Sequence, residues 1–161
     1  MIEISGAADI PQGGSGAGLH VLLVEDSVVN QRVGKHLLES EGCSVAIAAS
    51  GEEAIECLCA GAEHGFDLVV MDYHMPGLNG AETTAQVRAY EKGAIRRIPI
   101  IGVSATATVE QRHQCRISGM EDCLSKPYNI RHLRRILHHF SIRKSRRSVT
   151  SSSGTDARKR P

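Results

Sequence analysis

Five reactive side chains stand at or just beyond the ends of short apolar segments: Glu25, Asp26, Asp72, Ser104 and Lys126. Carboxylates are hard oxygen ligands of the kind that Mg²⁺ prefers, and a carboxylate can also attack phosphorus. The hydroxyl of Ser104 and the amine of Lys126 can contact the oxygens of a transferred phosphoryl group. These residue types therefore indicate phosphoryl-transfer chemistry at a magnesium site, if the fold brings them together.

Asp72 is the residue around which this chemistry would be organised. The four residues before it, 68–71, are apolar without alternation, which is typical of a strand buried on both faces of a parallel sheet. Met75-Pro76-Gly77 then breaks the strand and turns the backbone. Asp72 would thus lie at the carboxyl edge of a sheet, where open α/β folds bind their ligands. Taken alone, a single Asp at this place could equally cap the next helix.

The chain alternates between apolar and amphipathic segments. Strands are predicted at about residues 20–24, 43–48, 68–72, 99–103 and 121–124. The first helix is predicted by apolar residues four apart, Val29, Val33 and Leu37, after a cap at Ser27 or Asp26. Further helices are predicted from residue 50 onward and over about residues 80–90, 108–118 and 129–140. Five strand–helix units predict an α/β fold, with one parallel sheet wound on both faces and its carboxyl strand ends at one edge.

The two ends of the chain differ in composition from its middle. Residues 1–18 include a Gly-rich run that precedes the first strand and lacks the Lys-Ser/Thr of a phosphate loop, so they are predicted to be a flexible leader. Residues 143–161 carry seven Lys and Arg against one Asp, a net charge of +6, which leaves about −5 for the rest. Residues 19–141 are predicted to fold as one domain, and residues 142–161 to be a disordered basic tail.

The cysteines and the hydropathy exclude several classes of protein. The five cysteines are odd in number and lie in or beside apolar segments, which is typical of reduced core residues in an intracellular protein. Cys57 and Cys59 lack the spacing of a zinc site. No apolar run is long enough for a signal peptide or a membrane span. We therefore expect a protein of the cytoplasm or nucleus that binds no membrane and no zinc.

Four motifs at the predicted strand ends resemble those of a known family. They are Val24-Glu25-Asp26-Ser27, Met71-Asp72-Tyr73-His74-Met75-Pro76-Gly77-Leu78-Asn79-Gly80, Val103-Ser104-Ala105 and Leu124-Ser125-Lys126-Pro127. In this order they resemble the receiver domain of two-component response regulators, over about residues 19–141. Asn30-Gln31 and Gly119-Met120-Glu121-Asp122 make the chain most similar to phosphorelay receivers of hybrid histidine kinases and of stand-alone plant regulators. The resemblance implies a flavodoxin-like (βα)5 fold with strand order 2-1-3-4-5.

The resemblance also implies a role for each site residue. Asp72 would be the phosphoacceptor, Ser104 the switch hydroxyl and Lys126 the amine that contacts the phosphoryl group, with a cis bond between Lys126 and Pro127. Mg²⁺ would be held by Glu25, Asp26, Asp72 and the backbone carbonyl of His74. The donor would be a histidine-phosphotransfer protein or a histidine kinase. Such a domain is not an enzyme with its own substrate, and at most it catalyses its own phosphorylation and dephosphorylation.

One position departs from the family pattern. Many receivers carry Tyr or Phe three residues before the lysine, where this chain has Cys123. A Cys is a small side chain that packs readily in a core, so we interpret Cys123 as a packing residue rather than a redox group. Signalling through a rotating aromatic ring is then not expected. Phosphorylation should change the face formed by the fourth and fifth strand–helix units only slightly.

Other functions share parts of this pattern. An aspartate-nucleophile phosphohydrolase would carry a second Asp two residues after the first, where this chain has His74. A flavin-binding protein of similar fold would need a phosphate loop after the first strand, where Glu25 and Asp26 would repel a phosphate. A degenerate receiver that serves only as a docking module usually lacks an acid or the lysine, and this chain has kept them all.

The remainder of the chain bears on output and partners. No further domain follows the predicted receiver, so the sequence predicts a stand-alone regulator that signals by protein contact or acts as a phosphate sink. The basic tail could be a nuclear-import or nucleic-acid patch, but no aromatic residues interleave its charges, so nucleic-acid binding is not expected. The sequence gives no indication of the oligomeric state.

Overall fold

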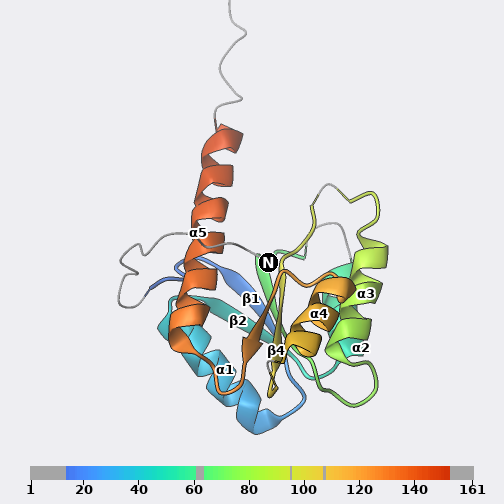
Figure 1. Cartoon of the computed structure of the whole chain (residues 1–161). Coiled ribbons are helices and arrows are strands. Elements are labelled where there is room, and N and C mark those ends of the chain that lie inside the picture. The colour runs from blue at the N-terminus through green and yellow to red at the C-terminus, as the bar shows by residue number, and fades with distance from the viewer. Residues whose placement is uncertain (1–13, 61–63, 95, 107, 153–161) are drawn as a thin grey trace, which may run out of the picture.

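A sheet of five parallel strands forms the centre of the protein, whose computed structural model describes residues 14–60, 64–94, 96–106 and 108–152 (Figure 1). The strands are β1 His20–Val24, β2 Ser44–Ala48, β3 Leu68–Asp72, β4 Ile100–Ser104 and β5 Asp122–Ser125. They pair in the order β2-β1-β3-β4-β5, and every pairing is parallel. The predicted α/β fold and its strand order are therefore confirmed.

The inner strands β3 and β4 are buried at every residue. Apolar runs without alternation suit this place, because helices cover both faces of the sheet. The strand register also brings strand ends together: Val24 of β1 pairs with Met71 of β3, and Asp72 pairs with Val103 of β4. Glu25, the residue after β1, consequently follows Val24 to the same edge of the sheet as Asp72.

Five helices cover the sheet in two layers. They are α1 Val28–Ser40, α2 Gly51–Cys59, α3 Gly80–Tyr90, α4 Val109–Ser118 and α5 Ile130–Ser152. In Figure 1, α1 and α5 lie on one side of the sheet, and α2, α3 and α4 lie on the other. Each layer has its own apolar core, with Leu38 and Leu133 in one and Leu58 and Val87 in the other.

Short polar side chains after the strands start the helices. Ser27 Oγ accepts a hydrogen bond from the Asn30 N–H, and Ser50 Oγ accepts one from the Glu53 N–H. These are N-caps, which satisfy a backbone N–H that has no partner within the first turn. Because Ser27 caps α1, the carboxylate of the neighbouring Asp26 is not needed for that purpose.

Two of the three apolar residues that predict α1 do not face the core, and the third, Leu37, is only partly buried against it. Val29 is 70% exposed and Val33 is 50% exposed, whereas Gly34 and Leu38 are buried. The helix approaches the sheet closely at Gly34, where an added side-chain carbon would lie 3.0 Å from the side chain of Leu23. The periodicity therefore identifies the helix correctly but not the face that it buries.

The predicted leader differs from the structure in its last residues. Ser15 and Gly16 are buried, and the Gly16 N–H donates a 2.8 Å hydrogen bond to the carbonyl of Glu41, between α1 and β2. Gly16 suits this place because a side chain would collide with the sulfur of Cys43. The prediction of a flexible leader is wrong for residues 14–18, and residues 1–13 lie outside the described residues.

The predicted basic tail also differs, because α5 continues to Ser152. Residues 141–152 contain neither Gly nor Pro to end the helix. Lys144 also holds this extension to the domain, since its Nζ donates to the Gly18 carbonyl over 2.6 Å and to Asp67 Oδ2 over 2.8 Å. In Figure 1 the last turns of α5 project beyond the sheet. The prediction of disorder is wrong for residues 142–152, and residues 153–161 lie outside the described residues.

The described helices include no candidate for a membrane span, since none combines sufficient length with sufficient hydropathy.

Candidate functional site

Three carboxylates form an acidic cluster at the carboxyl edge of the sheet, where the strands end. Glu25 and Asp26 follow β1, Asp72 ends β3, and each offers an oxygen within 4.8 Å of the others. Glu25 and Asp72 are buried, while Asp26 is exposed. Three carboxylates this close repel one another unless cations lie among them.

Lys126 brings one cation into this acidic cluster. Its Nζ lies 2.7 Å from Glu25 Oε2 and 3.2 Å from Asp72 Oδ2. The residue follows β5, and the peptide bond from Lys126 to Pro127 is cis. Residues from three separate strand ends therefore meet at one place, as the sequence predicts.

His74 and Ser104 lie at the same edge with different contacts. The His74 N–H donates a 3.2 Å hydrogen bond to Asp72 Oδ1, and the His74 side chain is exposed. The Ser104 hydroxyl is buried at the end of β4, where it donates to the Thr106 carbonyl over 3.2 Å and accepts from the Thr106 N–H over 3.3 Å. The hydroxyl is thus held by its own loop in this state of the protein.

The first turn of α1 supports the buried carboxylate of Glu25. The Ser27 N–H and the Asn30 side-chain amide each donate to Glu25 Oε1 over 3.2 Å, and the Gln31 amide donates to the Glu25 carbonyl over 2.7 Å. Asn30 and Gln31 belong to the family resemblance, but their contacts with Glu25 do not follow from the sequence pattern. The sequence does contain one signal for these contacts: two residues with amide side chains occupy the first turn of the helix that follows the acid pair.

Gly80 allows α3 to begin directly behind Asp72. Its N–H donates to the Tyr73 carbonyl over 3.0 Å, so the loop after β3 folds back on itself. A side chain at Gly80 would collide with the Asp72 backbone carbonyl. Gly80 therefore helps to fix the backbone that carries the Asp72 carboxylate.

The charges of the site shift its pKa values in different directions. Burial raises the pKa of Asp72, and although Lys126 and the His74 N–H oppose this, the pKa stays above its ordinary value. Burial also acts to raise the pKa of Glu25, but hydrogen bonds from Lys126, Asn30 and the Ser27 N–H outweigh it and leave the pKa below its ordinary value. Of these two buried carboxylates, Asp72 is the one for which burial outweighs the favourable contacts.

Lys126 remains a cation in this environment. Burial alone would lower its pKa, but contacts with Glu25 and Asp72 raise the pKa above its ordinary value.

Tyr128 packs behind the site against α1, since an added carbon on Gly34 would lie 3.2 Å from its hydroxyl. Burial, followed by the charges of Glu25 and Asp72, raises the pKa of Tyr128, so this phenol stays neutral.

The donor set fits a divalent cation. Glu25, Asp26 and Asp72 supply hard carboxylate oxygens, and the exposure of Asp26 leaves room for waters, which Mg²⁺ retains when it binds to proteins. One ammonium group among three carboxylates leaves an excess of negative charge in this cluster. A second cation would relieve this repulsion.

Cys123, where many receivers carry an aromatic residue, is buried next to Cys115 of α4. Both side chains are almost fully buried, and Cys115 Sγ would lie 3.2 Å from a carbon added to Gly102 of β4. The two thiols contact each other, and this contact is the largest cause that raises the pKa of Cys115 and lowers that of Cys123. The burial agrees with a packing role for Cys123.

Residues 21–138 match the sequence profile of a family described as the response regulator receiver domain. The chain is 36% identical over 154 residues to the virulence sensor protein BvgS of Bordetella parapertussis, a match that covers 89% of this chain and 12% of that protein. It is 34% identical over 126 residues to the two-component response regulator ARR15 of Arabidopsis thaliana, which covers 73% of this chain and 60% of that protein. The chain thus spans a small part of the first relative and about three fifths of the second.

Two solved structures are similar in fold. The receiver domain of the histidine kinase CKI1 from Arabidopsis thaliana, complexed with Mg²⁺ and BeF3⁻, is 30% identical with a TM-score of 0.69, covering 78% of this chain and 91% of that one. The receiver domain of the response regulator Ssk1 from Saccharomyces cerevisiae, crystallised with the histidine phosphotransfer protein Ypd1, is 32% identical with a TM-score of 0.63. That match covers 71% of this chain and 83% of the other.

Proposed function

The chain belongs to the response regulator receiver domain family, and from this premise we propose that it accepts a phosphoryl group on Asp72 from a phosphohistidine of a partner protein. One observation carries the proposal: the Asp72 carboxylate lies beside the other two members of the acidic cluster and beside Lys126, whose Nζ is 3.2 Å from Asp72 Oδ2. A carboxylate with an amine beside it can act as a nucleophile toward phosphorus, while the amine faces the oxygens of the transferred group.

In the proposed reaction a carboxylate oxygen of Asp72 attacks phosphorus. The bond between phosphorus and the imidazole nitrogen of the donor breaks as the bond to Asp72 forms, and the imidazole leaves with the electron pair. The His74 N–H orients Oδ1, and Lys126 offsets negative charge on the phosphoryl oxygens. Positioning and charge neutralisation supply most of the rate in phosphoryl transfer.

Mg²⁺ is the proposed cofactor, and the receiver domain of CKI1 crystallised with this ion is consistent with it. Glu25, Asp26 and Asp72, together with the backbone carbonyl of His74, are the groups that would hold it. When bound, the ion would supply positive charge for the carboxylates and the phosphoryl oxygens. The residues of this chain keep the same tasks: Asp72 attacks, and Lys126 contacts the transferred group.

Ser104 is the proposed switch residue. Its hydroxyl is engaged with Thr106 N–H and the Thr106 carbonyl, both in the loop after β4. A phosphoryl oxygen on Asp72 is a stronger acceptor than a neutral carbonyl. We therefore expect the hydroxyl to leave the Thr106 carbonyl and donate to the phosphoryl group, moving the loop with it.

The exposed end of α1 is the proposed docking surface for the donor. Val28, Val29 and Val33 are 59%, 70% and 50% exposed, and the first two follow directly after Asp26 and Ser27. An exposed apolar patch beside a reactive carboxylate suits a transient protein contact. The crystallised pair of Ypd1 and the Ssk1 receiver supports a histidine-phosphotransfer protein as the partner class. Downstream, the phosphorylated form would act by protein contact or drain phosphate from its donor.

Two other functions fit less well. An aspartate-nucleophile phosphohydrolase carries a second Asp two residues after its nucleophile, where this chain carries the exposed side chain of His74. A docking module without phosphate chemistry would not need a buried carboxylate whose pKa is raised, because such a group costs folding free energy.

The deciding experiment is transfer of radiolabelled phosphate from a purified histidine-phosphorylated carrier, with and without Mg²⁺. The wild type should become labelled in Mg²⁺, and the Asp72→Asn variant should not. Asp67→Asn is the matched control, because it removes a carboxylate at the start of β3 instead of at its end. Labelling of the Asp72→Asn variant at the wild-type level would refute Asp72 as the acceptor.

A further inference from the structure

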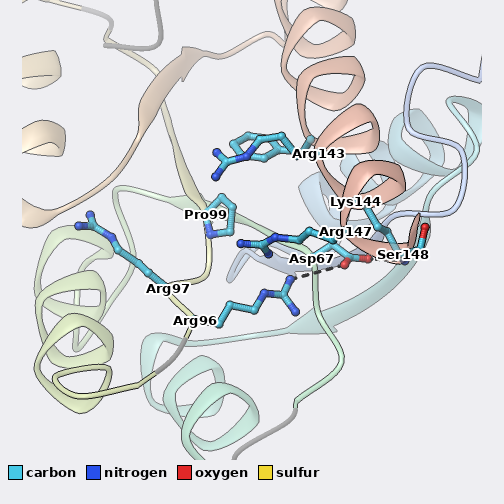
Figure 2. A pocket seen from close by; sticks show the side chains of 9 residues that line it. Asp67, Arg96, Arg97, Pro99, Arg143, Lys144, Arg147 and Ser148 are labelled. Carbon is cyan, nitrogen blue, oxygen red and sulfur yellow. Dashed lines mark hydrogen bonds and ion pairs between the residues drawn. The ribbon is translucent and has the colours of Figure 1, made fainter. Parts of the chain in front are cut away.

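A basic hollow of about 580 Å³ opens at the amino edge of the sheet, where β3 and β4 begin. Figure 2 shows it from close by. Its lining consists of Asp67, Arg96, Arg97, Pro99, Phe140, Arg143, Lys144, Arg147 and Ser148. Asp67 and Pro99 immediately precede β3 and β4, so the hollow lies at the opposite edge from Asp72.

Two segments far apart in sequence supply the cations. Arg96 and Arg97 lie in the connection from α3 to β4, and Arg143, Lys144 and Arg147 lie on the extension of α5. In Figure 2 the guanidinium groups of Arg96, Arg143 and Arg147 lie around the space beside Pro99. The hollow therefore exists only because α5 continues beyond the predicted end of the domain.

The hollow has a strong excess of positive charge. Among the described residues of the lining, five side chains are cationic and one, Asp67, is a carboxylate. The Asp67 carboxylate forms ion pairs with two of these cations: Oδ2 lies 2.8 Å from Lys144 Nζ, and Oδ1 lies 3.5 Å from the Arg96 guanidinium. Arg97 contacts Glu121 at 3.5 Å, but Glu121 also pairs with Arg88 at 3.2 Å. Among these described residues, the cations outnumber the carboxylates.

We propose that the basic hollow binds a small anion that carries two or more phosphate groups. Four of its five cations are arginines, whose planar forks bind phosphate oxygens in pairs. The volume lies within the range of small-molecule sites, which is roughly 300–1,000 Å³. Cations from two sides of one hollow can each hold a different phosphate of the same ligand, and a single phosphate would reach only some of them.

A nucleic-acid strand is the less suitable occupant. Proteins that bind single strands offer exposed aromatic rings on which bases stack. Here the ring of Phe140 is buried, and Arg143 covers it at 5.9 Å from its centre. The cations also surround a hollow and do not form a stripe along the surface, which favours a compact ligand.

Calorimetric titration of the full chain with inorganic tripolyphosphate tests the proposal, in buffer without Mg²⁺ and at constant ionic strength. We expect saturable binding with a Kd below about 100 µM. Inorganic monophosphate should bind at least about tenfold more weakly, since it engages fewer arginines. ATP forms a separate arm: if it binds more tightly than tripolyphosphate, the organic part of the ligand contributes as well.

Two double variants of α5 provide a matched comparison. Arg143→Gln with Arg147→Gln should weaken tripolyphosphate binding by about tenfold or more. Arg131→Gln with Arg135→Gln removes the same charge, at the same spacing, from exposed positions of the helix that do not line the hollow, and should change Kd by less than about twofold. Circular dichroism establishes that both variants fold. Asp67→Asn should tighten binding, because it removes the one carboxylate among the lining residues that the structure describes.

Three results would overturn the proposal. The first is the absence of saturation at about 1 mM tripolyphosphate. The second is equal weakening by the two double variants, which would mean a general charge effect. The third is tighter binding of an oligonucleotide, in proportion to its length, which would assign the surface to a nucleic-acid backbone. Asp72→Asn should bind tripolyphosphate like the wild type, so this result does not depend on phosphoryl acceptance.

Discussion

At the carboxyl edge of the sheet, Glu25 and Asp72 are buried around Lys126, whereas at the amino edge the cations of the basic hollow are open to solvent. The Lys126 side chain is 21% exposed, and that of Lys144, paired with Asp67, is 47% exposed. Water and salt screen exposed ion pairs much more than buried ones. The two edges therefore have opposite charge and should also differ in how strongly each charge is coupled to the fold.

The two edges also differ in the kind of element that supplies their charged side chains. At the carboxyl edge, strand ends deliver Glu25 and Asp72 from a paired and buried backbone. At the amino edge, a connection and a helix extension deliver the side chains. A site built on strand ends is held in one geometry, while a site built on a connection can adapt to its ligand.

Replacing Lys126 should have the largest effect. Lys126→Met leaves Glu25 and Asp72 buried without their cation, and we expect the free energy of unfolding at pH 7 to fall by about 3 kcal/mol. Its contacts raise the pKa of Lys126, so its contribution is complete at neutral pH and is lost as the pH rises through the raised pKa. Urea unfolding measures the loss, and phosphate transfer should fall with it. A cost no greater than that of Lys144→Met would remove the distinction between the two edges.

Addition of Mg²⁺ should come next in size. If the acidic cluster holds the ion, a concentration a hundredfold above Kd stabilises the fold by about 2.7 kcal/mol. Thermal unfolding with Mg²⁺ or with a chelator measures this difference. Asp26→Asn should reduce the response with little cost to the metal-free protein, because Asp26 is exposed. Arg143→Gln with Arg147→Gln should keep the full response, and loss of it there would place the ion elsewhere.

A smaller effect is expected from removing the negative charge of Asp72. Burial raises the pKa of this carboxyl, so its ionisation opposes folding once the pH exceeds the ordinary Asp value. Asp72→Asn should therefore be more stable than the wild type at pH 7, and the difference should shrink as the pH falls through the raised pKa toward the ordinary Asp value. Urea unfolding across this range checks the sign. A variant less stable than the wild type at pH 7 would mean that the pair with Lys126 outweighs burial.

The smallest effect should come from the amino edge. Lys144→Met should cost less than about 1 kcal/mol at low salt, and about 0.5 M NaCl should remove most of that cost, because the pair with Asp67 is half exposed. The cost of Lys126→Met should persist in the same salt. If salt reduced the stability costs of both substitutions to the same degree, the carboxyl edge would be as well solvated as the amino edge.

The sequence predicts the carboxyl edge well because each apolar strand ends at a polar residue. Asp72 follows four apolar residues, and the parallel topology then requires Glu25 and Lys126 to reach the same edge. Finer contacts are not predictable in this way. The hydroxyl of Ser104 is held by Thr106 because of the local path of its loop, and Asn30 donates to Glu25 because α1 begins at an angle that no spacing encodes.

The amino edge could not be predicted, because its order depends on distant contacts. Residues 142–152 have the polar composition of a disordered tail, and an isolated basic helix is marginal in water. Its extension is held by Lys144, whose partner Asp67 is 77 residues away. The exposed Val29 and Val33 do not show which face of α1 is buried, because a glycine, Gly34, lies where the helix closely approaches Leu23 of the sheet.

Strand β3 connects the two edges, since Asp67 immediately precedes it and Asp72 ends it. Five residue steps of extended chain separate the two carboxylates by roughly 17 Å. The strand is hydrogen-bonded to β1 and to β4 and is buried along its whole length, so it acts as a rigid spacer whose register cannot slip. A double-mutant cycle between positions 67 and 72 should accordingly give an interaction energy near zero. One molecule would then be able to carry a phosphoryl group on Asp72 and an anion in the basic hollow at the same time.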